Sequence, residues 1–320
     1  MGFWAKSGIL GLLVAGNGVI WANSPKIVGY YTSWAQFRAG EGQFMPENID
    51  GSLLTHAVFA FAKFDKKGHV LPLEHNDLSG PQGPGMYVRF NRLKKKYPHL
   101  KTLLSLGGAS VKSGDFNQAL SNSKSRHNLA KSLVNYAIKH GFDGVDVDWE
   151  FNKRTGSHQK CELLVQFLQE IRQIAINIGR SKFLITVVLG MQSIAGVDHY
   201  VKKISHLVDW FHVIGYDLHG SWDKYTDANA PLYQDNSNYE SVYCIDYLIK
   251  KYLKLGVSPK KLVLGMPAYG RSYGNVNLSR FFKNVRNSSK GPGRVGMFTK
   301  QPGILAYYEI LELLKNQQYH

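Results

Sequence analysis

Short runs of almost continuously apolar residues recur along this 320-residue chain and alternate with stretches of helical periodicity. β-Branched and aromatic residues dominate these runs, as is typical of strands that are covered on both faces. Between them, Arg126–His140 places Leu129 and Leu133 on one helical face, and Cys161–Ile178 and Tyr239–Leu255 behave similarly. The apolar runs are Ile27–Tyr31, Ala57–Phe61, Thr102–Leu106, Val145–Trp149, Leu184–Leu189, Phe211–Tyr216 and Leu262–Met266.

This alternation predicts parallel strands that are joined by crossover helices. With 44% hydrophobic and 19% charged residues, the chain can bury one large core. Seven strand–helix units favour a TIM-type α/β barrel over an open sheet. In such barrels the functional residues lie at the carboxyl ends of the strands.

The fourth run is unusual because it is acidic on one side. Side chains on a strand alternate faces, so Asp146, Asp148 and Glu150 point the same way, and the Val, Val and Trp between them point the other way. Carboxyls at roughly 6–7 Å per step repel one another, so one of their pKa values rises. A carboxyl that stays protonated near neutral pH is a general acid.

Two other interpretations of the acidic run are weaker. A solvated edge strand would not carry Val, Val and Trp on its second face. A calcium loop spaces its Asp residues within a turn and has Gly near the middle. The pattern therefore favours an active site.

The segment Asp143–Glu150 resembles the D-x-x-D-x-D-x-E signature of glycoside hydrolase family 18, the chitinases. Other segments resemble further family motifs in the same order, and together they cover nearly the whole chain after its first residues. They are Gly29–Trp34 (GYYTSW) continuing to Phe61, Ser105–Gly108 (SLGG), Gly215–Trp222 (GYDLHGSW), Gly265–Arg271 (GMPAYGR) and Tyr307–Ile310 (YYEI).

The resemblance implies a substrate-assisted, retaining mechanism, in which the 2-acetamido carbonyl of the sugar attacks the anomeric carbon. Glu150 would protonate the glycosidic oxygen and later activate water. Asp148 would hold the acetamido N–H, and Asp146 would share a proton with Asp148. Asp143 is out of phase with these three and is expected to be structural.

The resemblance also implies the substrate contacts. Tyr216 would align the acetamido carbonyl for attack. Trp149 is expected to point outward to the helices, and a core role is the alternative for the tryptophans placed in the site. The residues expected to bind substrate are Tyr30, Trp34, Asp217, Trp222 and Arg271. Ala109, Ile214 and Phe151 depart from the family's usual residues, but none of these changes removes a catalytic group.

The first residues resemble a secretory signal. Lys6 precedes a short apolar stretch, Ile9–Ile20, and small residues follow at Ala22 and Ser24. Because about 20 apolar residues are needed to span a bilayer, residues 1–24 are predicted to be a cleaved signal peptide and not an anchor. The protein is then expected to be secreted, with no membrane attachment after cleavage. Residues 25–274 would form the barrel.

Residues 275–320 are expected to form part of the family's α+β insertion. In the family, the eighth barrel strand follows that insertion and carries a Trp that forms the floor of the sugar-binding site. In this sequence the last Trp is Trp222, which precedes the insertion. We therefore predict a barrel that lacks its eighth strand. The structure should show either a gap between Ile27–Tyr31 and Leu262–Met266 or a substitute element filling it, and a partner segment could complete the barrel.

These observations predict a chitinase that cleaves β-1,4-linked N-acetylglucosamine in chitin or its oligosaccharides. The alternatives are a chitin-binding protein with little activity and a hydrolase of cell-wall or glycoprotein N-acetylglucosamine. No cofactor and no metal are expected, because no Cys/His spacing resembles a zinc site. The net charge of +16 comes from scattered lysines without a nucleic-acid motif, so no nucleic-acid partner is expected.

Overall fold

The computed structural model describes residues 9–14 by their backbone, and residues 25–149, 158–190, 200–234, 244–277 and 287–315. Each of the seven predicted strands is present, and they pair in parallel in the order in which they occur along the chain. The TIM-type arrangement is thereby confirmed. These strands are β2 (Ile27–Thr32), β3 (His56–Phe64), β5 (Lys101–Gly107), β6 (Gly144–Asp148), β7 (Leu184–Leu189), β8 (Trp210–Val213) and β9 (Leu262–Pro267).

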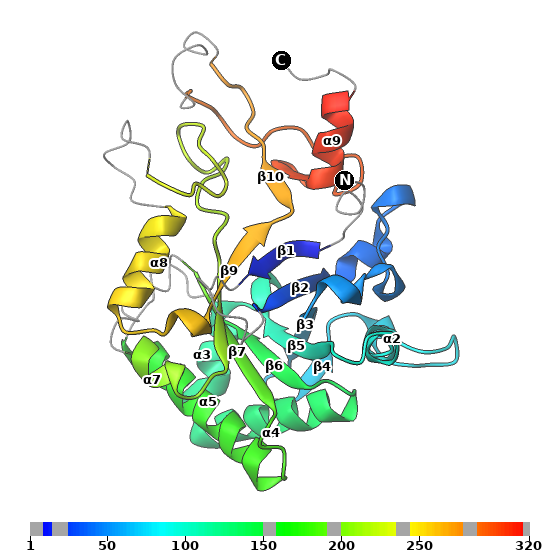
Figure 1. Cartoon of the computed structure of the whole chain (residues 1–320), viewed down its shortest axis with the longest axis vertical. Helices are drawn as coiled ribbons and strands as arrows, with labels where there is room; N and C mark the ends of the chain where they lie inside the picture. Colours follow the sequence, from blue (N-terminus) through cyan, green and yellow to red (C-terminus); the bar gives the residue numbers. More distant parts are fainter. Residues whose placement is uncertain are drawn as a thin grey trace.

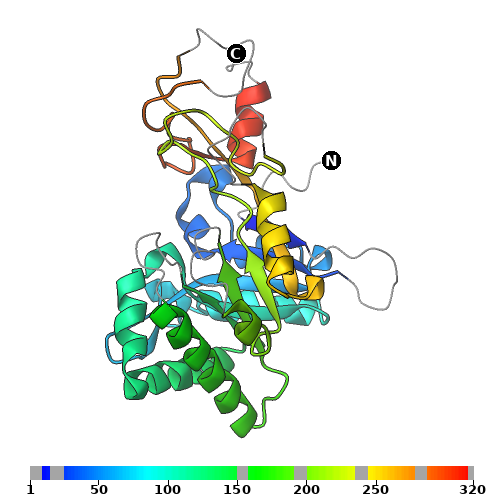
Figure 2. The same cartoon turned by 90° about the vertical axis from the view of Figure 1, so that its left-hand side faces the viewer.

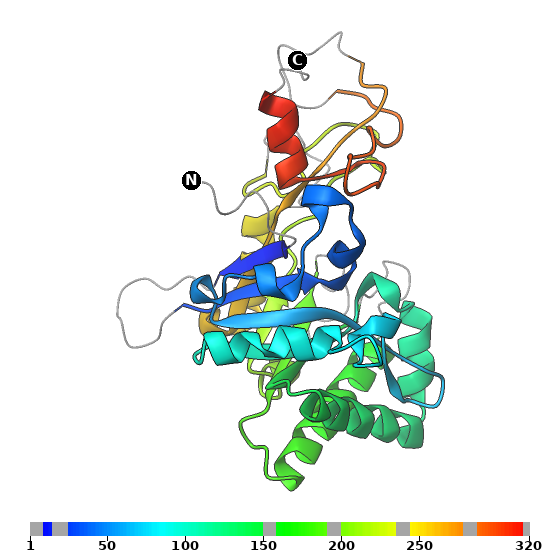
Figure 3. The same cartoon turned by 90° about the vertical axis from the view of Figure 1, so that its right-hand side faces the viewer.

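An additional strand, β1 (Ile9–Val14), closes the ring between β2 and β9. It runs antiparallel to both neighbours, with Leu12 opposite Gly29 on one side and Met266 on the other. Figure 3 shows β1 lying along β2. The predicted gap is therefore filled by a substitute element. Cleavage of residues 1–24 stays a prediction, and it would leave the edges of β2 and β9 unpaired.

Helices cover the outer face of the curled sheet (Figure 1).

The predicted Arg126–His140 helix begins earlier, as α4 (Ser123–Lys139), because the side chain of Asn122 accepts hydrogen bonds from the N–H groups of Lys124 and Ser125. Part of the predicted Tyr239–Leu255 helix lies outside the described residues. The other helices are α1 (Met86–Asn91), α2 (Leu93–Lys96), α3 (Ser113–Ser121), α5 (His158–Asn177), α7 (Val201–Ser205), α8 (Ile245–Lys254) and α9 (Tyr307–Lys315).

Short elements complete the described part of the chain. Strand β4 (Val70–Pro72) pairs antiparallel with the end of β3. The 3-10 turns span Ser33–Phe37, Gly40–Gly42, Pro46–Asn48, Gly51–Leu53, His75–Asp77, Gly108–Ser110 and Pro259–Lys261.

The strands separate two apolar cores. Outward-facing side chains, such as Val145 and Val147 of β6, pack with the helices in the larger core. A smaller core fills the inside of the barrel, as in other TIM-type barrels. Its buried members come from five strands and are Val28, Val58, Leu103, Trp210 and Val263.

A small extension rises from one end of the barrel (Figures 1 and 2). Strand β10 (Tyr269–Arg271) pairs antiparallel with β11 (Ile304–Ala306), which leads into α9. The buried Glu309 of α9 accepts hydrogen bonds from the N–H groups of Phe298 and Ala306 and so fixes the adjoining loop. Since β10 precedes residue 275, this small sheet spans the predicted boundary of the insertion. Within the described ranges no helix is both long and apolar enough to cross a membrane.

Candidate active site

The acidic strand β6 points its polar side chains into the barrel. Asp146 is fully buried and Asp148 is 7% exposed. Burial and the charge of Asp146 raise the pKa of the Tyr30 hydroxyl, and the charge of Asp148 adds to this effect. Glu150, the predicted acid, lies outside the described residues, and its role stays a prediction.

Asp146 is held by donors from four different strands. The hydroxyls of Ser105 on β5 and Tyr30 on β2 donate to its Oδ2 at 2.7 and 2.9 Å. Thr186 on β7 donates to Oδ1 at 2.6 Å, and Nδ1 of His212 on β8 lies 3.1 Å from the same oxygen. A carboxyl surrounded in this way is fixed in orientation and accepts at both oxygens.

These donors decide the charge of Asp146. Burial alone raises its pKa, but His212, Thr186 and Ser105 more than offset this, so the pKa lies below its ordinary value. The upward shift that repulsion between carboxyls would cause is not seen at Asp146. Burial, followed by the charges of Asp146 and Asp148, instead raises the pKa of Tyr30 well above its usual range, so Tyr30 stays a donor.

A second cluster lies where β8 and β9 lead into the extension. Arg271 binds Asp217 through two bonds, Nε to Oδ1 at 2.8 Å and Nη2 to Oδ2 at 2.7 Å. The hydroxyl of Tyr269 donates to the same Oδ1 at 2.6 Å. The Arg271 guanidinium also lies 5.0 Å from the ring centre of Trp222, which is 56% exposed. This cluster joins an anchored carboxylate to an aromatic face open to solvent.

Tyr216 connects the two clusters. Its ring meets that of Tyr269 edge-on at 6.0 Å, and its hydroxyl contributes to the raised pKa values of both Tyr30 and Tyr269. The predicted residues Tyr30, Asp146, Asp148 and Tyr216 therefore lie near one another, and Asp217, Trp222 and Arg271 adjoin them through Tyr269.

The remaining tryptophans have different surroundings. Trp34 is half-buried and stacks on Phe61, with the ring centres 6.0 Å apart. Trp149 is 2% exposed, stacks on Phe116 at 5.3 Å and donates its Nε1–H to Ser113. As predicted, Trp149 belongs to the outer core and not to the site.

Sequence reasoning missed two groups in this site. Tyr269 lies inside the GMPAYGR motif but received no role, although its position between Gly265 and Arg271 was a usable signal. His212 precedes Tyr216 on a predicted strand, and its period-two spacing from Trp210 indicates an inward side chain. Nothing in the local sequence indicates that His212 meets Asp146.

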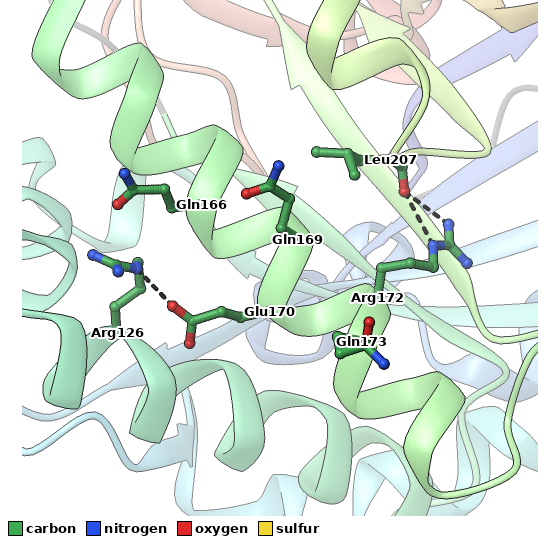
Figure 4. A pocket seen from close by; sticks show the side chains of 7 residues that line it. All are labelled: Arg126, Gln166, Gln169, Glu170, Arg172, Gln173 and Leu207. Atoms are coloured by element: carbon green, nitrogen blue, oxygen red, sulfur yellow. Dashed lines mark hydrogen bonds and ion pairs between the residues drawn. The ribbon is translucent and has the colours of Figure 1, made fainter.

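A surface hollow lies elsewhere, on the outer side of α5 (Figure 4). Its volume is about 530 Å³. Arg126 is paired there with Glu170 at 2.7 Å, and Arg172 donates to the carbonyl oxygen of Leu207 at 2.9 Å. Its lining residues are Arg126, Gln166, Gln169, Glu170, Arg172, Gln173 and Leu207, and none of them belongs to the two clusters.

Within the described ranges, no group of His, Cys, Asp or Glu residues could hold a metal ion. The two cysteines, Cys161 and Cys244, are buried thiols. The described part of the site presents carboxyl, hydroxyl, imidazole and guanidinium groups beside an exposed aromatic ring.

Known proteins resemble this chain in sequence and in fold. Mouse chitotriosidase-1 is 34% identical over 313 residues, which cover 95% of this chain and 65% of that protein, so the chain spans less than two thirds of this relative. The structure of Ostrinia furnacalis Group IV chitinase in complex with allosamidin is 32% identical with a TM-score of 0.81, covering 91% of this chain and 78% of that one.

A second similar structure is described as that of a pseudo-chitinase. Human YKL-39, described as a pseudo-chitinase with retained chitooligosaccharide binding properties, is 29% identical with a TM-score of 0.79, covering 90% of this chain and 78% of that one. The model of the family "Glycosyl hydrolases family 18" matches residues 26–320. This chain therefore belongs to glycosyl hydrolase family 18.

Proposed function

We propose that this protein is a secreted chitinase that cleaves β-1,4-linked N-acetylglucosamine in chitin or chito-oligosaccharides. The observation that carries the proposal is the anchoring of Asp146 by donors from four strands. This anchoring fixes β6, so Asp148 follows at the inner surface and Glu150 comes two residues later. Asp146 and Asp148 are therefore positioned by strand β6 and not by a loop.

In the proposed reaction the substrate supplies the nucleophile. Glu150 donates a proton to the glycosidic oxygen while the 2-acetamido carbonyl oxygen attacks the anomeric carbon. Asp148 accepts a hydrogen bond from the acetamido N–H and stabilises the oxazolinium ion that forms. Glu150 then takes a proton from water, which opens the ion and gives a product with retained configuration.

The other site residues are proposed to bind the sugar. Tyr216 would donate to the acetamido carbonyl oxygen from its place between the two clusters. Asp217 and Arg271 would contact sugar hydroxyls, and the exposed ring of Trp222 would pack on an apolar sugar face. Tyr30 and Trp34 were also predicted to contact substrate. The bonds from Tyr30 to Asp146 favour a supporting role for it instead.

The similar proteins favour this substrate class. Their names describe a chitotriosidase and a chitinase bound to allosamidin. Binding without hydrolysis is the second candidate, because the eighth place of the barrel is taken by the antiparallel β1 and because YKL-39 is a pseudo-chitinase that retains chitooligosaccharide binding. The presence of Glu150 in the sequence favours hydrolysis.

The test is turnover of a fluorogenic chitotrioside by the purified chain and by Glu150→Gln. The amide keeps the shape of the side chain but has no acidic proton, so we expect at least a 10²-fold loss of kcat, with oligosaccharide binding unchanged by calorimetry. The control is Glu162→Gln on α5, whose carboxylate lies 3.9 Å from Lys203 at the surface. Binding without turnover in the unmodified chain would favour the second candidate.

A further inference from the structure

Two side chains of β8 extend the Asp146 network away from the acidic strand. Trp210 and His212 are two residues apart, so both point into the barrel, and they are 2% exposed. The indole Nε1 of Trp210 lies 2.6 Å from Nε2 of His212. On the other side of the imidazole, Nδ1 lies 3.1 Å from Asp146 and in contact with the hydroxyl of Tyr30.

The chemistry of Trp210 fixes the proton on His212. An indole N–H donates and cannot accept, so Nε2 of His212 must be the acceptor. The ring proton then lies on Nδ1, from which it is donated to Asp146. The opposite tautomer would place two N–H groups against each other at Nε2 and leave Asp146 without this donor.

Packing holds Trp210 in place. The ring of His56 meets it edge-on at 4.6 Å, and Nζ of Lys26 lies 5.5 Å from the ring centre. Trp210 also belongs to the inner apolar core together with Val58 and Val263. Because these contacts come from several strands, the indole cannot turn without disturbing the barrel interior.

We propose that Trp210 and His212 form a positioning pair that locks the Nδ1–H tautomer of His212 and so holds Asp146 as an oriented carboxylate beneath Asp148. The inference rests on the proposed function for its effect on turnover. Four donors hydrogen-bond to Asp146 and favour its charged form. The proton that Asp146 and Asp148 are expected to share therefore resides on Asp148.

The tautomer is measured directly by ¹⁵N NMR of the imidazole nitrogens in the full chain. The signals of His212 are assigned by their loss in His212→Asn, since the sequence holds 12 histidines. We expect a neutral ring with the proton on Nδ1. In Trp210→Phe, which keeps an aromatic ring but lacks the donor, the two tautomers should mix. A proton on Nε2 in the unmodified protein overturns the proposal, whatever the activity.

The effect on the reaction is measured by kcat and KM for a chitotrioside. His212→Phe should lower kcat about 10 to 100-fold, the cost of losing a hydrogen bond to a charged group, with KM nearly unchanged. His212→Asn should recover most of the rate, because its amide N–H can replace Nδ1–H. Trp210→Phe should lower kcat by an intermediate factor. It provides the test of the positioning role if His212→Phe does not fold.

The failures of the two ideas are distinguishable. An unmodified chain without turnover, but with a Trp210-dependent Nδ1–H signal, contradicts the proposed function and leaves the tautomer lock in place. Equal kcat in the unmodified chain and in folded His212→Phe overturns the positioning role. A rate that His212→Asn does not restore also overturns it.

Discussion

Thr186→Val tests how much of the Asp146 network is electrostatic. The substitution exchanges a hydroxyl for a methyl group of similar size in a position that is fully buried. It removes one donor, at 2.6 Å from Oδ1 of Asp146, and leaves Tyr30, Ser105 and His212 in place. The packing of β7 should therefore change little, and the measured effect belongs to the hydrogen bond.

The expected loss of stability follows from the negative charge of Asp146, the partner of the lost hydrogen bond. A hydrogen bond to an ionised group contributes about 1.5–3 kcal/mol, so we expect the free energy of unfolding to fall by about 2 kcal/mol at pH 7. The same loss raises the pKa of Asp146 in the folded state, because one of the donors that favour its charged form is gone.

The sign of the pH dependence is a stricter test. The folded-state pKa of Asp146 is lowered, so its stabilising contribution is present above its ordinary value of 3.8 and is lost as the pH falls through the folded value. The difference between Thr186→Val and the unmodified chain should therefore shrink only as the pH falls through the folded pKa of Asp146 in each chain, which in the unmodified chain lies below 3.8.

The assay is urea unfolding monitored by circular dichroism between about pH 2 and pH 7. Ser205→Ala is the matched control, because that buried hydroxyl donates to the neutral carbonyl oxygen of Lys202 at 2.8 Å, and its loss should not vary with pH. A Thr186→Val effect that is below about 0.5 kcal/mol at pH 7, or that is equal at both ends of the range, would refute the reasoning.

Three further predictions concern other parts of the chain. Arg271→Lys should raise KM for chitotrioside several-fold with little change in kcat, because Lys cannot make both bonds to Asp217; an unchanged KM contradicts a binding role. Burial raises the pKa of Asp77 from 3.8 to about 7, so stability should be lost as pH rises through 7, and Asp77→Asn should abolish that loss in the same unfolding assay. Mass spectrometry of the protein from a secreting host should find a start near Pro25, and a retained residue 9–14 segment would contradict the predicted cleavage.

The closure of the barrel by β1 affects the interpretation of turnover measured with and without residues 1–24. Strand β1 pairs with both β2 and β9, and a closed ring has no exposed strand edges. Chains with and without residues 1–24 should therefore be compared in stability before their turnover is compared. A shorter chain that unfolds more easily would lose activity for a reason unrelated to its catalytic groups.

The strands and their partners were predictable because they follow from local patterns. Seven apolar runs alternating with helical periodicity predicted a parallel barrel, and the structure pairs these strands in sequence order. The period-two spacing of Asp146 and Asp148 predicted that they share the inner face. The outward position of Trp149 followed from the same alternation, and the structure confirms it.

The sequence did not predict which groups meet across the barrel. Tyr30 and Asp146 are 116 residues apart, and His212 and Asp146 are 66 apart. No local pattern reports such a contact, because the ring curvature and strand stagger bring these side chains together. The lowered pKa of Asp146 depends on those donors, so spacing along the acidic strand could not show which carboxyl pKa is lowered.

What the sequence determined by itself was therefore the class of fold and the identity of the acidic strand, since both depend on spacing along the chain. Tertiary structure alone decided that β1 occupies the eighth position, since the pairing partners of an apolar run depend on which strand edges are open. It also decided that Trp210, through His212, reaches Asp146. Hydrogen bonds between distant strands form only after the ring has closed, and those bonds set the charge and orientation of the buried carboxylate.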